Sequence, residues 1–291
     1  LKIHEIFDAS INKELKGLWI IGEDIVQTDP NSAHVIKAME ALDLLVVQEI
    51  FLSETAKYAD VVLPGTTFLE KDGTFTNTER RVQRVNKAAE PLHGTKPDGV
   101  IVTDMMQKLG YDQPTYDADQ VLAEVADVVP FFKGITRERL GKLGLQWPVK
   151  EDGTDTKILH EKEFKLGKGR LKYFDWKESS ELKNNKKEYP LILTTSRVLQ
   201  HYNAATMTRR TKNLKIVDED ILLVHPNDAK HRELNTGDIA RLYSGRGEVS
   251  LKVEVTNNVK EGIVFTTFHF PEHMVNMVTG DGKDEETKCA E

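Results

Sequence analysis

The first part of the chain alternates between short apolar runs and segments in which apolar residues recur at helical spacing. The runs at 17–22, 44–48 and 60–64 are almost entirely apolar, as in buried strands. Between them, residues 30–42 show helical spacing after an Asp-Pro-Asn start, and residues 53–59 are typical of a short helix. Strands and helices that alternate over such short distances predict an α/β fold with a doubly wound parallel sheet.

Helical patterns continue beyond this region and then give way to a polar segment. Residues 98–110 and 118–129 have the apolar stripes of amphipathic helices, and a shorter helix is expected near 135–142. Residues 143–188 are rich in Lys, Gly, Asp and Glu, so we expect a solvated connection with room for a hairpin. The first domain is therefore predicted to cover residues 1–142, with a linker over 143–188.

From residue 189 to residue 291 the pattern is that of an all-β domain. Short apolar runs alternate with turn signals, such as Asn235-Thr236-Gly237-Asp238 and Gly245-Arg246-Gly247, and one helix is expected over 225–234. Five short strands with tight turns between them predict a closed β-barrel over 189–291.

Composition narrows the class of protein. The 291 residues are 39% hydrophobic and 30% charged, which is ordinary for a globular protein. No run approaches the ~20 apolar residues of a membrane span, and no signal peptide opens the chain, so we expect a cytoplasmic protein without a membrane span. The net charge of −7 argues against nucleic acid as a partner. The single cysteine, Cys289, excludes an internal disulfide, and its polar surroundings make it a poor nucleophile.

Polar residues gather where the predicted strands of the first domain end. One strand runs into Gly22-Glu23-Asp24, the next into Gln48-Glu49, and the third into a Pro-Gly turn followed by Glu70-Lys71. Open parallel sheets bind ligands at the carboxyl ends of their strands. A carboxylate there can accept two N–H bonds from a guanine edge or bind a ribose, and a lysine can meet a phosphate. The pattern favours a nucleotide, with solvated loop residues as the alternative, and it contains no standard dinucleotide or P-loop motif.

The β-domain has its own candidate site in TTSRVLQHYNAATMTRR, residues 194–210. Thr195, Ser196, Arg197, His201 and Tyr202 lie close together there, which suits a phosphate or pterin contact. By itself His201 is at least as readily a structural histidine. The spacing of His269 and His273 is helical, but Pro271 between them interrupts the helix that would aim both at one metal ion.

Four segments, taken together, resemble a known family: IGEDIVQTDPN, LLVVQEIFLSETAKYADVVLP, EKDGTFTNTERRVQ and TSRVLQHYNAATMTRR. They are similar to the molybdopterin oxidoreductases of the dimethyl-sulfoxide-reductase class, and most similar to the C-terminal part of a formate dehydrogenase alpha subunit. The resemblance implies a partial α/β domain that binds molybdopterin guanine dinucleotide, followed by a β-barrel of the double-psi type. It also implies two such dinucleotides that hold molybdenum or tungsten.

The resemblance assigns expected roles by position. Lys71 would contact the dinucleotide directly, while Glu70, Asn77, Glu79 and Arg80 would hold the shape of the loop around it. The remaining cofactor contacts are expected from two stretches and a late pair: Gly22, Glu23, Asp24, Gln48, Glu49 and Asp98 for the guanosine or phosphate pocket; Thr195, Ser196, Arg197, Leu199, His201 and Tyr202 for pterin and phosphate; and Phe268 with Asn276.

The same resemblance places the reacting centre outside this chain. The family's metal ligand, its active-site histidine and arginine, and its iron–sulfur cysteines precede the matching part, so we expect no catalytic residue and no metal ligand here. Family members also continue past the position of Glu291, and Cys289 falls in the polar lead-in to that continuation. The missing N-terminal part of the polypeptide and an electron-transfer subunit or carrier are the expected partners.

The implied activity is oxidation of formate to carbon dioxide, with electrons leaving through iron–sulfur clusters. Two alternatives remain open. A nitrate reductase-type enzyme would share the cofactor motifs, although the tip Gly22-Glu23-Asp24 is more like the formate enzymes. A non-catalytic cofactor-binding module would be expected to have lost pocket residues, yet Asp24, Lys71, Asp98 and Arg197 are all present.

Overall fold

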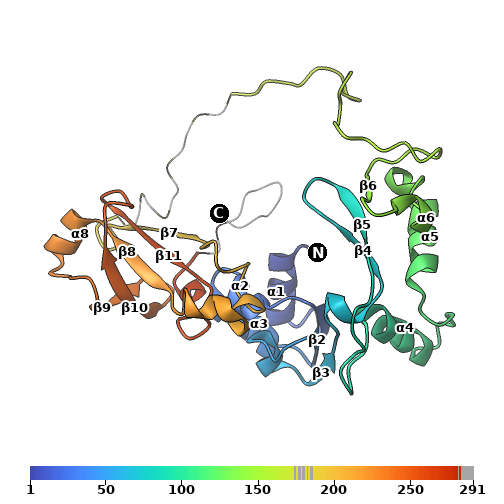
Figure 1. Ribbon diagram of the computed structural model, residues 1–291. Coiled ribbons are helices and arrows are strands. Elements are labelled where there is room, and N and C mark those ends of the chain that lie inside the picture. Colours follow the sequence, from blue (N-terminus) through green and yellow to red (C-terminus); the bar gives the residue numbers. More distant parts are fainter. Residues whose placement is uncertain are drawn as a thin grey trace. The chain divides into compact units, whose positions relative to one another are not determined.

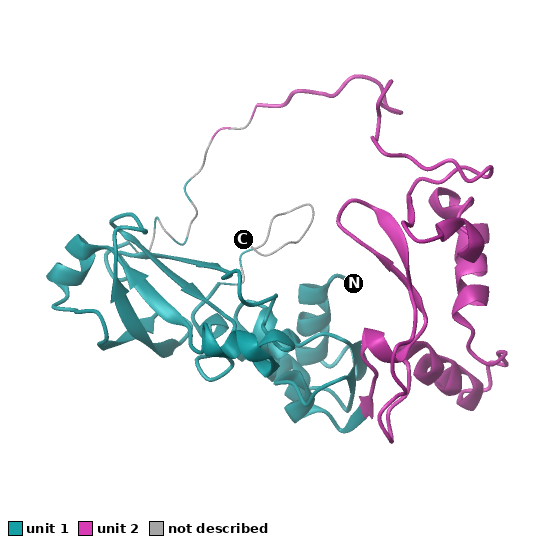
Figure 2. Cartoon of the chain, viewed as in Figure 1, with its two compact units in different colours: residues 1–62, 176–291 teal, residues 63–175 magenta. Residues whose placement is uncertain are grey.

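The computed structural model describes residues 1–173, 175, 178, 181, 183, 186–280 and 282. The chain forms two compact units, one made of residues 1–62 and 176–291 and the other of residues 63–175 (Figure 2). In the part of the chain that the structure describes, no helix has the length and apolar character needed to cross a membrane. Cys289 lies outside the described residues.

The N-terminal part of the first unit is an α/β layer (Figure 1). Its strands are ordered β1-β2-β3, and β1 runs parallel to β2 with Gly17 opposite Leu44 and Ile21 opposite Gln48. The elements are α1 (Ile3–Ile11), β1 (Gly17–Ile21), α2 (Ile25–Thr28), α3 (Ser32–Glu40), β2 (Leu44–Glu49), the 3₁₀ helix η1 (Thr55–Tyr58) and β3 (Val61–Pro64). The predicted alternation of strands and helices is confirmed, and α1 and α2 are additional helices that the sequence pattern did not predict.

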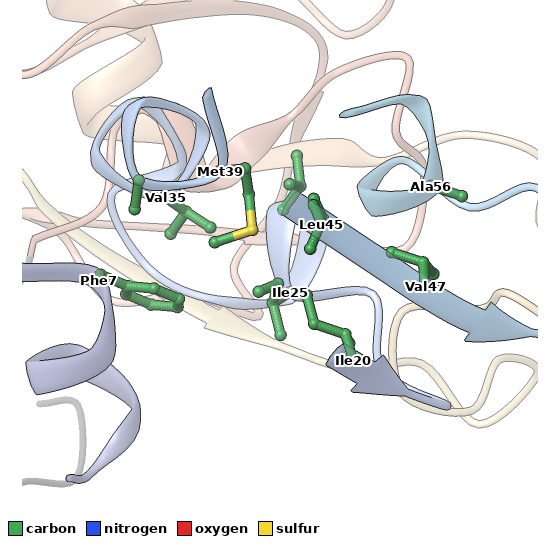
Figure 3. Packing of buried hydrophobic residues seen from close by; sticks show 10 residues of the cluster. Phe7, Ile20, Ile25, Val35, Met39, Leu45, Val47 and Ala56 are labelled. Atoms are coloured by element: carbon green, nitrogen blue, oxygen red, sulfur yellow. The ribbon is translucent and has the colours of Figure 1, made fainter. Parts of the chain in front are cut away.

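The core of this layer forms where helices and strands bury their apolar faces together. Phe7 from α1, Val35 and Met39 from α3, and Leu45 and Val47 from β2 are all buried and point toward one another (Figure 3). Val35 and Met39 are one helical turn apart, so the 3.6-residue period of α3 places both on its inner face. This packing fixes the direction of β1 and β2, and therefore the position of their carboxyl ends.

The rest of the first unit is dominated by a mixed sheet with the strand order β7-β11-β8-β10-β9. β7 is parallel to β11 and β8 to β10, while β11 with β8 and β10 with β9 are antiparallel. The elements are β7 (Ile192–Ser196), η4 (Thr208–Arg210), η5 (Lys212–Lys215), β8 (Ile221–Val224), α8 (Pro226–His231), β9 (Ile239–Tyr243), β10 (Glu248–Val255), β11 (Ile263–Thr267) and η6 (Val275–Met277). All the strands and the helix predicted from the sequence are present.

One face of this sheet is buried. Alternate residues of β10, Val249, Leu251 and Val253, point into the core, whereas the residues between them face outward. Buried residues of β8 and of the segment around η6 complete the cluster. The described part of the first unit is thus mixed α/β, with a parallel-strand layer and a mixed sheet.

The second unit contains a β-hairpin that the sequence pattern did not predict. β4 (Gly73–Thr76) and β5 (Arg81–Val85) pair antiparallel, and β5 also pairs with β6 (Leu145–Gln146). The unit also holds η2 (Phe68–Glu70), α4 (Asp98–Lys108), α5 (Ala118–Val128), η3 (Pro130–Phe132) and α6 (Arg137–Leu140). Most of the hairpin's side chains are polar or exposed, so the two-residue alternation that marks a half-buried strand is weak.

The segment predicted as a linker, 143–188, begins with residues that pack inside the second unit. β6 joins the hairpin, and Val149 is buried in a cluster with Val82, Leu122, Ile135 and Leu140. Two β6 residues and one buried valine are too few to produce a periodic signal among so many charged neighbours.

Candidate functional site

The carboxyl ends of β1 and β2 lie side by side in the first unit. The two strands are parallel and in register up to the pair Ile21 and Gln48, and the Gly22 N–H then donates to the Gln48 carbonyl at 2.9 Å. Gly22 has φ = 67°, a left-handed conformation, and a Cβ there would meet nothing within 4 Å. This glycine therefore turns the chain at the strand end and leaves open space beside it.

The buried Asp24 side chain links the segments that follow β1 and β2 by hydrogen bonds. One carboxylate oxygen accepts hydrogen bonds from the Thr55 N–H at 2.9 Å and the Thr55 hydroxyl at 2.8 Å. The other oxygen accepts from the Glu54 N–H at 3.3 Å. The carboxylate thus holds the segment after β2 against the turn after β1. Glu23 is exposed and Glu49 is half-buried, so the strand ends present acidic groups outward.

Asp29 adds a titratable group close to these acids. The pKa of Asp29 is raised to about 6, mainly by burial; the hydrogen bond from the Thr28 hydroxyl lowers it, and the charge of Glu23 adds a smaller increase. A folded-state pKa above the usual value of about 3.9 means that ionisation of this carboxyl opposes folding. The unfavourable contribution is absent below pH ~4 and is complete above pH ~6.

Replacing Asp29 with Asn is therefore expected to stabilise the protein at neutral pH. The shift from 3.8 to about 6 corresponds to about 1–3 kcal/mol at pH 7.5, and to about a third of that at pH 4.5. Denaturant unfolding of the full-length protein at both pH values measures the effect, with the exposed Asp43→Asn as control. An equal gain at the two pH values would contradict the assignment.

A compact turn follows β7 and carries most of the residues predicted for pterin and phosphate contacts. The Arg197 guanidinium donates to the Asn203 side-chain oxygen at 3.0 Å and lies 5.1 Å from the centroid of the Phe268 ring. Asn203 adopts a left-handed φ of 53°, which asparagine tolerates better than most residues. Leu199 and Tyr202 are 103% and 78% exposed, so the turn presents them outward.

His201 lies on the inner side of the same turn. It is 4% exposed, and its Nε2 lies 2.9 Å from the Val217 carbonyl, to which it can only donate. Its Nδ1 lies 3.0 Å from the Thr208 hydroxyl, which also accepts from the Tyr202 N–H at 3.2 Å. Both ring nitrogens of His201 therefore bond to the protein itself, and a cofactor contact from this residue stays a prediction.

Two arginines lie close to the acidic strand ends in this unit. The Arg210 guanidinium carbon is 4.1 Å from the centroid of the Phe51 ring, which follows β2. Burial and the neighbouring Arg209 lower the pKa of Arg210, whereas Asp24 and Glu49 raise it. Within the described residues, the buried Arg209 Nη1 has no hydrogen-bond partner. Carboxylates, an aromatic face and guanidinium groups therefore come together from segments distant in sequence.

Sequence reasoning missed the residue that connects the two sheets of the first unit. Gln27 is 3% exposed, and its side-chain nitrogen donates to the carbonyls of Ala204, Phe268 and His269 at 3.1, 3.2 and 3.1 Å. Asn276, which was predicted, donates back to the Gln27 carbonyl at 2.8 Å and is also buried. The only sequence signal for Gln27 is that a polar residue follows the two apolar residues of the short helix IVQT.

Most of the predicted barrel-side residues thus lie together at the end of β7, and two other predicted contacts lie elsewhere. Thr195 and Ser196 end β7, and Phe268 follows β11, which pairs with β7 in register. Lys71 and Asp98 belong to the second unit, where the Lys71 ammonium forms an ion pair with the Asp98 carboxylate. The predicted residues therefore form two groups, one within each unit.

The ion pair of Lys71 and Asp98 lies beside a pocket of about 250 Å³ within the second unit. Phe75, Val125 and Phe132 contribute apolar walls, and Tyr116 adds a phenol. Gly99 allows this arrangement because a Cβ at that position would lie 2.1 Å from the Tyr116 ring. The pocket is therefore lined by this pair of opposite charges together with apolar side chains.

The polar residues at 70–81 bond in two separate places: Glu70 lies next to Lys71, whereas Asn77 and Arg80 belong to the turn between β4 and β5. Glu70 accepts from the N–H groups of Thr67 at 2.9 Å and Leu92 at 3.0 Å, and these bonds lower its pKa. The Asn77 side-chain oxygen accepts from the N–H groups of Glu79 and Arg81. Arg80, at φ = 66°, donates through its guanidinium to the carbonyls of Trp147, Thr156 and Lys157. The charged run at 77–81 is therefore a structural network.

Comparison with known proteins gives relatives along the whole chain. The alpha subunit of an F420-dependent formate dehydrogenase from Methanocaldococcus jannaschii is 44% identical over 100% of this chain and 44% of its own length. The alpha subunit of F420-dependent formate dehydrogenase 2 from Methanococcus maripaludis is 42% identical over 96% of the chain and 42% of its own length. The chain thus spans less than half the length of these relatives.

A solved structure and two family models agree with these relatives. Acetylene hydratase from Pelobacter acetylenicus superposes with a TM-score of 0.71 at 19% identity, over 95% of this chain and 43% of that chain, which concerns the fold alone. Residues 2–108 match the family model “Molybdopterin oxidoreductase”, and residues 191–291 match “Molydopterin dinucleotide binding domain”. The chain thus matches the molybdopterin oxidoreductase model in its N-terminal part and the dinucleotide-binding model in its C-terminal part.

Proposed function

We propose that this chain is the cofactor-binding C-terminal part of a formate dehydrogenase catalytic subunit, which oxidises formate to carbon dioxide. The observation that carries the proposal is the 44% identity to a formate dehydrogenase alpha subunit along the entire chain. The intact enzyme would bind two molybdopterin guanine dinucleotides with molybdenum or tungsten. Its iron–sulfur cluster, metal ligand and substrate-contacting residues would come from the missing N-terminal part.

The side chains present suit such a dinucleotide. A guanine edge needs hydrogen-bond acceptors, and Glu23 and Glu49 lie at the ends of the two parallel strands. A pyrophosphate needs cations, and Arg197, Arg209 and Arg210 follow β7 in the same unit. The buried Arg209 Nη1, which lacks a hydrogen-bond partner among the described residues, is a donor of the kind that a phosphate oxygen would satisfy.

In this proposal the chain's own residues bind and orient. Glu23, Glu49 and the open space beside Gly22 would receive the guanosine, and the turn after β7 would bind pterin and phosphate through Arg197 and Tyr202. Lys71 and Asp98 would contact a dinucleotide from the second unit. When bound, the metal–pterin group supplies two-electron redox chemistry, while the protein contributes binding, orientation and electrostatics. We also propose that the mixed sheet belongs to a double-psi barrel and that residues 1–142 form one dinucleotide-binding domain.

An assay of the full-length protein, purified without oxygen from its own host, tests this function. We expect formate-dependent reduction of a redox dye, together with about one molybdenum or tungsten per chain measured by elemental analysis. F420, the acceptor named for the relatives in methanogens, serves as a second electron acceptor in the same assay.

The two measurements separate the alternatives. Bound metal together with nitrate-dependent oxidation of a reduced dye, and no dye reduction with formate, would contradict the formate assignment in favour of a nitrate reductase-type enzyme. A full-length protein without either metal would contradict the proposal as a whole and favour a non-catalytic module.

A further inference from the structure

His269 lies at the base of the turn that follows β7, and the cofactor assignments above give it no role. Its side chain is 0% exposed. Its Nε2 lies 3.2 Å from the backbone nitrogen of Val198, and its Nδ1 lies 2.7 Å from the carbonyl oxygen of Asn203. One imidazole ring therefore bonds to the backbone on both sides of the turn.

The two partners determine where the proton of this imidazole resides. The Val198 N–H can only donate, so Nε2 must accept and carries no proton. The Asn203 carbonyl can only accept, so Nδ1 must carry the proton. His269 is therefore a neutral imidazole with the proton on Nδ1, and a second proton on Nε2 would oppose the Val198 N–H directly.

The backbone of His269 is held by other groups. The buried Asp220 carboxylate accepts from the His269 N–H and the Phe270 N–H, both at 3.1 Å, and from the Thr267 hydroxyl. The Gln27 side chain donates to the His269 carbonyl at 3.1 Å. The backbone of His269 is thus held independently of the turn, so its side chain can set the position of that turn.

We propose that His269 is a positioning residue that joins the two sides of the turn at 198–203 and thereby orients Arg197, Leu199 and Tyr202 toward the dinucleotide. The orientation toward the dinucleotide rests on the proposed function, whereas the link between Val198 and Asn203 does not. His269 acts through the turn, and its ring does not reach the surface.

The charges around the ring predict how this link responds to pH. Burial lowers the pKa of His269, and His201 and Arg197 lower it further, while the bond to Asn203 and the charge of Asp220 raise it. A lowered folded-state pKa means that the link is intact above the unfolded value of about 6.5 and is lost as pH falls through the lower folded value.

Two substitutions test the bond to Val198 and the bond to Asn203 separately. In His269→Asn the side-chain nitrogen takes the place of Nδ1, so the bond to Asn203 can persist while the Val198 N–H loses its acceptor. In His269→Gln the side-chain oxygen takes the place of Nε2, so the Val198 N–H keeps an acceptor. His273→Gln is the matched control, because His273 is a half-exposed neighbour whose Nδ1 lies 3.1 Å from the Ser250 carbonyl, which is not part of the turn at 198–203.

Residue-resolved hydrogen exchange of the full-length protein gives the first readout. We expect the Val198 amide to exchange about tenfold faster or more in His269→Asn, and to stay protected in His269→Gln and His273→Gln. In the wild type, Val198 protection should fall on acidification beyond the intrinsic change in exchange rate. Retention of the dinucleotide, measured as pterin released after gel filtration, should be lower in His269→Asn than in the control.

The exchange and retention measurements can each overturn the proposal. Equal Val198 exchange in His269→Asn and in His273→Gln would overturn the proposal, as would faster exchange with unchanged dinucleotide retention. If the wild type holds no dinucleotide, the proposed function fails, and the exchange comparison still decides whether His269 joins the two sides of the turn.

Discussion

Replacing Asp220 with Ala should lower the free energy of unfolding of the β-rich part of the chain by about 2–4 kcal/mol. Asp220 is 0% exposed and precedes β8. Its carboxylate accepts from the N–H groups of His269 and Phe270 at 3.1 Å and from the Thr267 hydroxyl. Hydrogen bonds to a charged acceptor are the stronger class, and truncation leaves these buried donors without a partner.

Denaturant unfolding of the full-length protein measures the loss, and hydrogen exchange localises it. We expect the amides of His269 and Phe270 to lose protection first, because they lose their acceptor directly. Asp218→Ala, two residues away and exposed, is the matched control. Equal stability of the two variants would show that the Asp220 carboxylate does not hold the end of β11.

The elements whose signal is periodic were predictable from the sequence. The continuously apolar β1 and β2, and α3 with its apolar residues one turn apart, were predicted within two residues of their ends, because burial imposes those patterns directly. The hairpin of β4 and β5 was not predicted. Its strands are held by cross-strand pairing and by the Arg80 network, and neither leaves a periodic apolar pattern.

Residues of the candidate site were likewise predictable only where their signal lies in a continuous stretch of sequence. The acidic strand ends and the turn after β7 were identified because polar residues cluster there in sequence. Gln27, Asp220 and His269 were missed because each contacts segments far away in the chain. Gln27 and Phe268, for example, are 241 positions apart. His269 was considered only for metal binding with His273, and its two backbone partners are visible only in the folded chain.

Replacing Gln27 with Glu is expected to be more damaging than any neutral substitution there. The Gln27 side-chain nitrogen lies 3.1–3.2 Å from three carbonyl oxygens, so a carboxylate oxygen in that position would oppose all of them. The side chain is also 3% exposed, so water cannot screen the charge. We expect a loss of about 3–5 kcal/mol in the free energy of unfolding at pH 8.

The pH dependence of that loss identifies its cause. Burial and the opposing carbonyls should raise the pKa of the introduced carboxyl above its unfolded value of about 4.3. The charge penalty is therefore absent below that value and grows as pH rises toward the folded pKa, so the variant should recover much of its stability at pH 4.5. Gln27→Met removes the same hydrogen bonds without adding charge, and its smaller loss should be the same at both pH values. Equal losses for Glu and Met at pH 8 would mean that the Gln27 amide does not hold the two sheets of the first unit together, because a carboxylate facing three buried carbonyls cannot be tolerated as well as a thioether.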